Sequence, residues 1–120
     1  MKRKVLSLAL VLTAVAFSAS SAQAQEMQSV TGEVIDIVCY TNMGMTGEGH
    51  RECAQSCADV GLPLGLLGED GNVYLATAPG MMAPLPKDML RGHAAHQVTL
   101  EGMINERSGA RAIVVSKVSM

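Results

Sequence analysis

All three cysteines of this 120-residue chain lie within one stretch of 19 residues, and a histidine lies among them. The pattern is C-x10-H-x2-C-x3-C, formed by Cys39, His50, Cys53 and Cys57. On a helix, Cys53 and Cys57 would share one face with their Cβ atoms roughly 5–6 Å apart. That separation lets two thiolates bind one metal ion, since each metal–sulfur bond is about 2.3 Å long. The cluster constrains the fold because Cys39 must be brought to the segment that holds the other three residues.

The position of His50 decides what kind of site this is. His50 lies about two helical turns, or roughly 10 Å, from Cys57 if both are on one helix. We expect the imidazole to reach the same ion only if His50 folds back from the glycine-rich loop, which Gly47 and Gly49 permit. The first hypothesis is a transition-metal site of three thiolates, with His50 as fourth ligand or outer partner. Tetrahedral sulfur and nitrogen ligation suits zinc, and a soft three-sulfur set suits copper(I).

Two alternatives use the same cysteines differently. Exported cysteines usually oxidise, so Cys39 could form a disulfide with Cys53 or Cys57 and leave one thiol free. The protein would then be a non-catalytic interaction module stapled by that bond, with an unidentified protein partner. A third hypothesis is thiol redox chemistry through Cys53 and Cys57. The odd number of cysteines disfavours a purely structural disulfide framework. The sequence predicts no catalytic residue, because no catalytic triad, phosphate loop or H-E-x-x-H motif occurs.

The first 24 residues have the order of a secretory signal peptide. A basic start precedes an apolar run from Val5 to Phe17, and small residues follow, up to Ala22-Gln23-Ala24. Cleavage near Ala24 would leave residues 25–120 as a single domain with six basic and eleven acidic side chains, a net charge of −5. We therefore expect a periplasmic or secreted protein without a membrane anchor in its mature form, because the apolar run is shorter than the roughly 20 residues of a membrane span.

The composition of residues 25–120 excludes some partners. The domain is acidic, and Tyr40 and Tyr74 are its whole aromatic complement. Nucleic-acid binding is disfavoured, because the chain offers neither phosphate neutralisation nor stacking platforms. A core so poor in aromatic residues also favours a metal or disulfide staple.

The hydrophobic pattern predicts a mainly β fold. Residues Gln28 to Tyr40 are rich in Val and Ile and predict a strand, followed by a loop from Thr41 to Gly49 and a helix from His50 to Val60. The remaining predicted elements are a hairpin of Leu64–Leu67 and Val73–Ala78, a helical turn at Lys87–Arg91, and strands at Gln97–Asn105 and Ala112–Val118. This order is typical of a small five-stranded OB-like Greek-key barrel with a helix inserted between strands 1 and 2. An open antiparallel sheet with one helix is the alternative. Gly32 and Gly102 lie inside strands, where a tight barrel needs bends.

Two segments resemble parts of known proteins. Val98-Thr99-Leu100-Glu101-Gly102, followed by Gly109 and Ala112-Ile113-Val114-Val115, resembles the closing strands of small exported bacterial OB-fold proteins. The segment from Cys39 to Cys57 is similar to a motif of exported bacterial proteins. The resemblance implies an OB-fold-type periplasmic domain and no catalytic residue.

Other residues are weaker candidates. Met43 and Met45 lie in the cluster loop and could add thioether donors for copper(I), although methionine is also a flexible core filler. His93 and His96 form an H-x-x-H pair, which we interpret mainly as solvated loop histidines. Further acidic and methionine residues have simpler interpretations: Glu33 and Asp36 as exposed partners of Arg or Lys, Glu48 and Glu52 as flanking charges, and Met81 and Met82 as packing residues.

Overall fold

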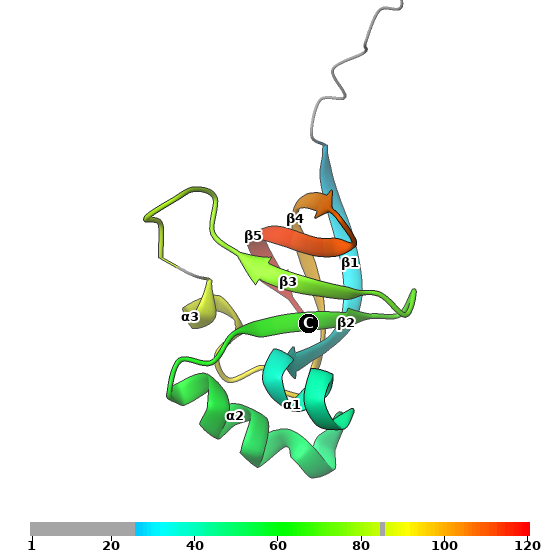
Figure 1. Cartoon of the computed structure of the whole chain (residues 1–120), viewed down its shortest axis with the longest axis vertical. Helices are drawn as coiled ribbons and strands as arrows, with labels where there is room; N and C mark the ends of the chain where they lie inside the picture. The colour runs from blue at the N-terminus through cyan, green and yellow to red at the C-terminus, as the bar shows by residue number, and fades with distance from the viewer. Residues whose placement is uncertain (1–25, 85) are drawn as a thin grey trace, which may run out of the picture.

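The computed structural model describes residues 26–84 and 86–120, so the expected signal peptide, residues 1–24, lies outside the described residues. Figure 1 shows a β structure with two helices gathered at one end. Along the chain, the elements are β1 (Met27–Asp36), α1 (Ile37–Met43), a 3-10 turn η1 (Glu48–His50), α2 (Arg51–Asp59), β2 (Leu64–Gly68), β3 (Val73–Thr77), α3 (Lys87–Leu90), β4 (Gln97–Arg107) and β5 (Ala110–Ser119).

The five strands form one mixed sheet that closes into a ring. The strand order is β1-β2-β3-β5-β4, and β1 completes the ring because it pairs with β2 over residues 32–36 and with β4 over residues 27–33. The β3–β5 pair is parallel, and the other pairs are antiparallel. The predictions of a mainly β fold, five strands and a helical insert between the first two strands are confirmed. The alternative of an open antiparallel sheet is wrong.

The first strand is shorter than predicted. It ends at Asp36 rather than at Tyr40, and the chain turns directly into α1. The carboxylate of Asp36 caps this helix, because its Oδ1 accepts a hydrogen bond of 2.6 Å from the backbone N–H of Cys39. The Val and Ile residues of this segment favour a strand, and the cap overrides them. The predicted loop after Tyr40 thus begins as a helix.

Two strand glycines stand where neighbouring backbones come closest. A Cβ on Gly32 would overlap the carbonyl oxygen of Leu67 in β2, and one on Gly102 would overlap that of Val114 in β5. The register between β4 and β5 also shifts at Glu101 and Gly102, which marks a bulge. The sequence-based role of both glycines, to let a small ring close, agrees with these contacts.

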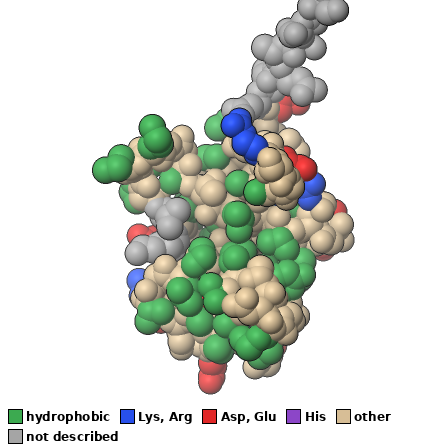
Figure 2. All heavy atoms as spheres, in the orientation of Figure 1, with side chains coloured by type: hydrophobic (Ala, Val, Ile, Leu, Met, Phe, Trp, Pro, Cys, Tyr) green, Lys and Arg blue, Asp and Glu red, His purple; other side chains and the backbone are tan. Residues whose placement is uncertain are grey.

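The surface carries many large apolar side chains. Figure 2 shows apolar side chains gathered over one face, with acidic and basic side chains mostly at its margins. Three of the exposed apolar residues, Val38, Met43 and Met45, belong to α1 and the loop after it. The methionines Met81 and Met82, on the connection between β3 and α3, are fully exposed. Met43, Met45, Met81 and Met82 therefore do not fill the core, which leaves the loop position as the part of the packing interpretation that agrees with the structure. No helix in the described ranges is long and apolar enough to cross a membrane.

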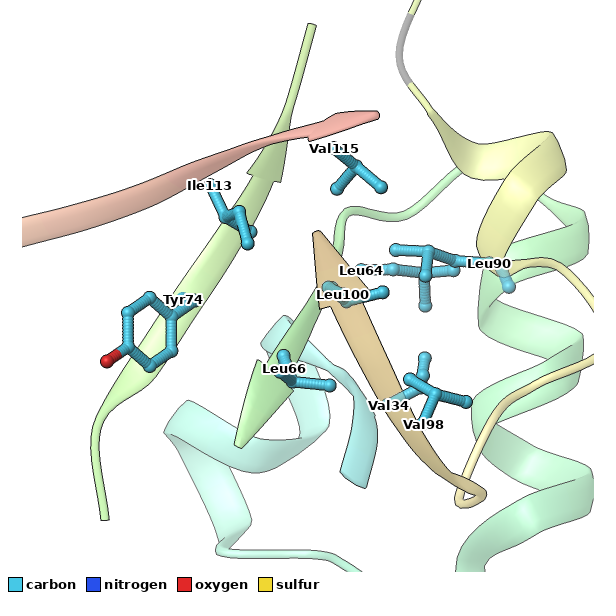
Figure 3. Packing of buried hydrophobic residues seen from close by; sticks show 10 residues of the cluster. Val34, Leu64, Leu66, Tyr74, Leu90, Val98, Leu100, Ile113 and Val115 are labelled. Atoms are coloured by element: carbon cyan, nitrogen blue, oxygen red, sulfur yellow. The ribbon is translucent and has the colours of Figure 1, made fainter. Parts of the chain in front are cut away.

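The core fills the inside of the ring. Figure 3 shows aliphatic side chains from β1, β2, β4, β5 and α3, together with the ring of Tyr74 from β3, lining the inside of the ring. The members of this cluster are Val34, Ala58, Leu64, Leu66, Tyr74, Leu90, Val98, Leu100, Ile113 and Val115. In β4 the burial alternates as predicted, with Val98 and Leu100 buried and Thr99 between them half-buried. One helix, α2, contributes Ala58 to the core, which seats the helical insert against the ring.

Candidate metal centre

The cysteine and histidine residues lie where β1 ends and the helical insert begins. Cys39 is on α1, His50 ends the 3-10 turn, and Cys53 and Cys57 are on α2. Figure 1 shows α1 and α2 side by side at this end of the ring. The cap of α1 by Asp36 places Cys39 in the first turn of the helix, which directs its side chain toward α2.

Short-range contacts hold the loop between the two helices. Gly44 ends α1 in the left-handed conformation, with φ of 66°, and donates its N–H to the carbonyl of Tyr40. Gly47, with φ of 81°, precedes the 3-10 turn, and its N–H donates a 2.6 Å hydrogen bond to Glu33 Oε1 on β1. His50 therefore lies before α2 and outside its regular turns. His50 comes within 4.8 Å of donor atoms of Cys39 and Cys53, but it shares no donor set with Cys57.

Contacts from the other side of the ring hold α2. Arg91 Nε donates to Asp59 Oδ1 at 2.9 Å, and the N–H of Gly92 donates to Gln55 Oε1 at 3.1 Å. The backbone after α3 thus supports the helix that carries Cys53 and Cys57. Both helices of the insert are fixed to strands or to loops of the ring.

The structure brings the candidate donors together in two overlapping sets. One donor atom each from Cys39, His50 and Cys53 lie within 4.8 Å of one another, and so do atoms from Asp36, Cys39 and Cys57. Cys39 belongs to both sets. Its Sγ lies 4.0 Å from Cys57 Sγ. Two thiolates bound to one tetrahedral ion at about 2.3 Å each lie about 3.8 Å apart, so this pair is already spaced as metal ligands.

Burial and unpaired polar atoms agree with a metal site. Cys39 and His50 are each 6% exposed, Cys57 is half-buried and Cys53 is exposed. The Nε2 atom of His50 is buried and has no hydrogen-bond partner. A buried polar atom without a partner costs about 1–3 kcal/mol, and a metal ion beside Cys39 would remove that cost. The exposed side chain of Cys53 leaves one side of the site open to solvent.

The pKa values of the Cys39 and Cys57 thiols are both raised. Burial raises the pKa of Cys39 to about 12, and the contact with Cys57 and the negative charge of Asp36 add to the effect. Burial also raises the pKa of Cys57, although its hydrogen bond with Cys39 acts in the opposite direction. Metal ions bind the thiolate, so binding here must release protons.

The cysteines are free thiols in this structure. The Cys39–Cys57 sulfur separation of 4.0 Å is about twice a disulfide bond of about 2.05 Å. The geometry therefore changes the redox hypothesis: Cys39 and Cys57 are adjacent across two helices, whereas the sequence pointed to Cys53 and Cys57.

The structure contradicts several roles that the sequence predicted for residues outside the cysteine cluster. Glu33 accepts from Gly47, and Asp36 is buried as a helix cap, so neither is the exposed partner of Arg or Lys that we expected. His93 and His96 are half-buried rather than solvated: their rings are 6.1 Å apart, and each has a buried Nδ1 without a partner. Neither of these two histidines belongs to the two donor sets.

The acidic residues that flank the cluster, Glu48 and Glu52, differ in their contacts. Glu48 Oε1 pairs with Arg51 at 3.2 Å on the surface, where such a pair contributes little. Glu52 lies in the first turn of α2 and belongs to neither donor set.

The residue that sequence reasoning missed is Asp36. Its signal was present, because an Asp three residues before Cys39 is a helix-capping spacing. The Val and Ile residues on both sides of Asp36 hid it by predicting that the strand continued.

Comparisons with family models, with curated proteins and with solved structures found no match for this chain.

Proposed function

We propose that this protein is a small exported metal-binding protein that holds a transition metal, zinc or copper, through Cys39, His50, Cys53 and Cys57. The observation that carries the proposal is that Cys39 Sγ lies 4.0 Å from Cys57 Sγ and also within 4.8 Å of donor atoms of Cys53 and of His50, whose Nε2 is buried without a partner. His50 and Cys53 complete the donor set around Cys39. Sulfur and nitrogen donors of this kind suit zinc and copper better than magnesium or calcium.

The proposal includes a compartment and a fold family. The basic, apolar and small-residue order of residues 1–24 supports export to the periplasm or beyond. The closed ring with a parallel β3–β5 pair and helices between β1 and β2 supports an OB-type barrel. In such a barrel the connection after the first strand is a usual position for ligand contacts, and this connection holds the donors.

Metal content and free thiols, measured together on the purified protein, test the proposal. We expect about one equivalent of metal in the wild type, with no thiol consumed by a disulfide. The double variant C53S/C57S removes two ligands and should lose the metal. His50→Gln should weaken binding, whereas His96→Gln, which changes a histidine outside the donor sets, should not. A protein with no metal and a single free thiol would overturn the proposal in favour of the stapled module.

A second candidate is thiol redox chemistry, which the proximity of Cys39 and Cys57 favours. In that case a mild disulfide oxidant would be reduced: its S–S bond breaks, it takes up the two electrons and two protons of this thiol pair to give two thiols, and a bond forms between Cys39 Sγ and Cys57 Sγ. The free-thiol count would then fall by two and recover with a reducing agent, in protein that binds no metal. Cys53→Ser would leave this change intact, whereas Cys57→Ser would abolish it.

A further inference from the structure

One oxygen of the Asp36 carboxylate is buried without a hydrogen-bond partner, and this carboxylate raises the pKa of the thiols of Cys39 and Cys57. The side chain is 1% exposed. Oδ1 accepts the N–H of Cys39 at 2.6 Å, whereas Oδ2 is buried and has no hydrogen-bond partner. The four ion pairs found among the described residues all involve other acidic groups. Buried charges in proteins are paired with another charge or coordinate a metal ion.

The position of the Asp36 carboxylate favours coordination of a metal ion over pairing with another charged side chain. A carboxylate oxygen of Asp36 lies within 4.8 Å of both Cys39 Sγ and Cys57 Sγ. The groups that share this donor set with the carboxylate are thiols, which become negative when they bind a metal. A cation between the carboxylate and the two sulfurs would compensate all three negative groups.

Helix capping alone does not account for Asp36. Capping uses one oxygen, and Ser, Thr or Asn supply that oxygen about as well as Asp. None of these alternatives would bring a second, charged oxygen into a buried site. The choice of Asp gives the site a second carboxylate oxygen, Oδ2, which is buried and has no hydrogen-bond partner.

We propose that Asp36 is an oxygen ligand of the metal centre, and that it biases the centre toward a divalent ion of the zinc class over copper(I). This inference rests on the proposed metal-binding function. Carboxylate oxygen is an ordinary zinc ligand at about 2.0–2.2 Å. Copper(I) is selected by soft thiolate and thioether donors and gains little from a hard oxygen. Because Cys39 belongs to both donor sets, an ion bound to its sulfur is within reach of donors from each.

Two matched variants test the role of the carboxylate. Asp36→Asn retains an oxygen that caps α1 and removes the charged ligand. Glu33→Gln is the control: it removes one negative charge from the same strand and retains an acceptor for the N–H of Gly47, and Glu33 is in neither donor set. Affinities for Zn²⁺ and for Cu(I) are measured by competition with chelators of known strength.

We expect Asp36→Asn to weaken Zn²⁺ binding by about tenfold or more and Cu(I) binding by less than about threefold. Glu33→Gln should change the affinity for Zn²⁺ or for Cu(I) by less than about threefold, since it removes a charge that acts on the ion only through long-range electrostatics. With Co²⁺ in place of zinc, the visible d–d bands of Asp36→Asn should shift from those of the wild type. In ¹³C-labelled wild type, the carboxyl resonance of Asp36 should move on Zn²⁺ addition while that of Asp70 stays fixed.

Other results would distinguish a failure of the ligand role of Asp36 from a failure of the proposed metal-binding function. Equal Zn²⁺ affinity and an unchanged Co²⁺ spectrum in Asp36→Asn would overturn the role of Asp36 and leave the proposed function standing. Equal losses for Zn²⁺ and Cu(I) would mark Asp36 as a support of the fold and also overturn the inference. Wild-type protein that binds neither ion overturns both. If Asp36→Asn does not fold, Asp36→Ser replaces it, and an Asp36 resonance unmoved by zinc in the wild type counts against the ligand role.

Discussion

The seating of α1 against the ring should depend on the absence of a side chain at Gly65 in β2. A Cβ at this position would lie 2.5 Å from Cδ1 of Ile37, in α1, and 2.7 Å from the carbonyl oxygen of Tyr74 in β3. Side-chain Cβ atoms essentially never approach other heavy atoms closer than 3.0 Å. Because the Tyr74 oxygen belongs to the backbone, Gly65→Ala must shift the β2–β3 pair, and it must also change the position or rotamer of the Ile37 side chain on α1.

The size of this effect follows from two opposing terms. Overpacking of a close contact costs about 1–3 kcal/mol. Replacement of Gly by Ala restricts the unfolded chain and returns about 0.4–1 kcal/mol. The steric term is larger, so we expect a net loss of about 1–2 kcal/mol. For a domain of this size each kcal/mol corresponds to about 4–8 °C in Tm, which predicts a Tm lowered by about 4–16 °C.

Circular dichroism melting of wild type, Gly65→Ala and Gly80→Ala, with equal metal content, measures the difference. Gly80 is the control because nothing lies within 4 Å of a Cβ at that position. We expect Gly80→Ala to melt at or slightly above the wild-type temperature. Since Ile37 is in the same short helix as Cys39, Gly65→Ala should also weaken metal binding. Equal melting of the two variants would refute the reasoning.

Three further predictions concern the core, the hairpin and the metal. Leu66→Ala, at a fully buried side chain, should cost about 2–5 kcal/mol in urea unfolding, and a loss under 1 kcal/mol would show that the ring interior repacks easily. The hydroxyl of Tyr74 and then the groups of Asn72 lower the pKa of Asp70 to about 2. The stabilisation by Asp70 is thus present above about pH 4 and lost as the pH falls toward 2. The stability difference between wild type and Asp70→Asn should shrink over that range, and a constant difference would contradict this. Zn²⁺ at about 100 times its Kd should raise the free energy of unfolding by about 2.7 kcal/mol, and Cys53→Ser should lose that gain.

Much of the strand pattern could be predicted because alternation and turn residues are local signals. The β2–β3 hairpin follows from Asp70 and Gly71, and β4 follows from the alternation that begins at Val98. The end of β1 could not be predicted in the same way, because the Val and Ile residues of this segment favour a strand and the helix cap overrides that preference. The Oδ1 contact of Asp36 decides the outcome, and that contact exists only after the chain has turned.

The sequence predicts which cysteine and histidine residues form the candidate site, but it does not predict how these residues divide into two donor sets. Spacing alone places Cys53 and Cys57 on one helix face and Cys39 elsewhere. It does not show that Cys57 faces Cys39 and Asp36 while Cys53 faces His50 and Cys39. That division depends on the crossing of α1 and α2, which the loop around Gly47 and its bond to Glu33 determine.

The sequence separation of the donors has a consequence for the order of folding. Cys39 and Cys57 are 18 residues apart, whereas the contact of Thr31 with Thr99, which joins β1 to β4, spans 68. Loop-closure entropy grows with the logarithm of this separation, so the first closure costs about 1 kcal/mol less than the second. The helical insert can therefore bring its sulfurs together with less loss of chain entropy than the strands need to close the ring.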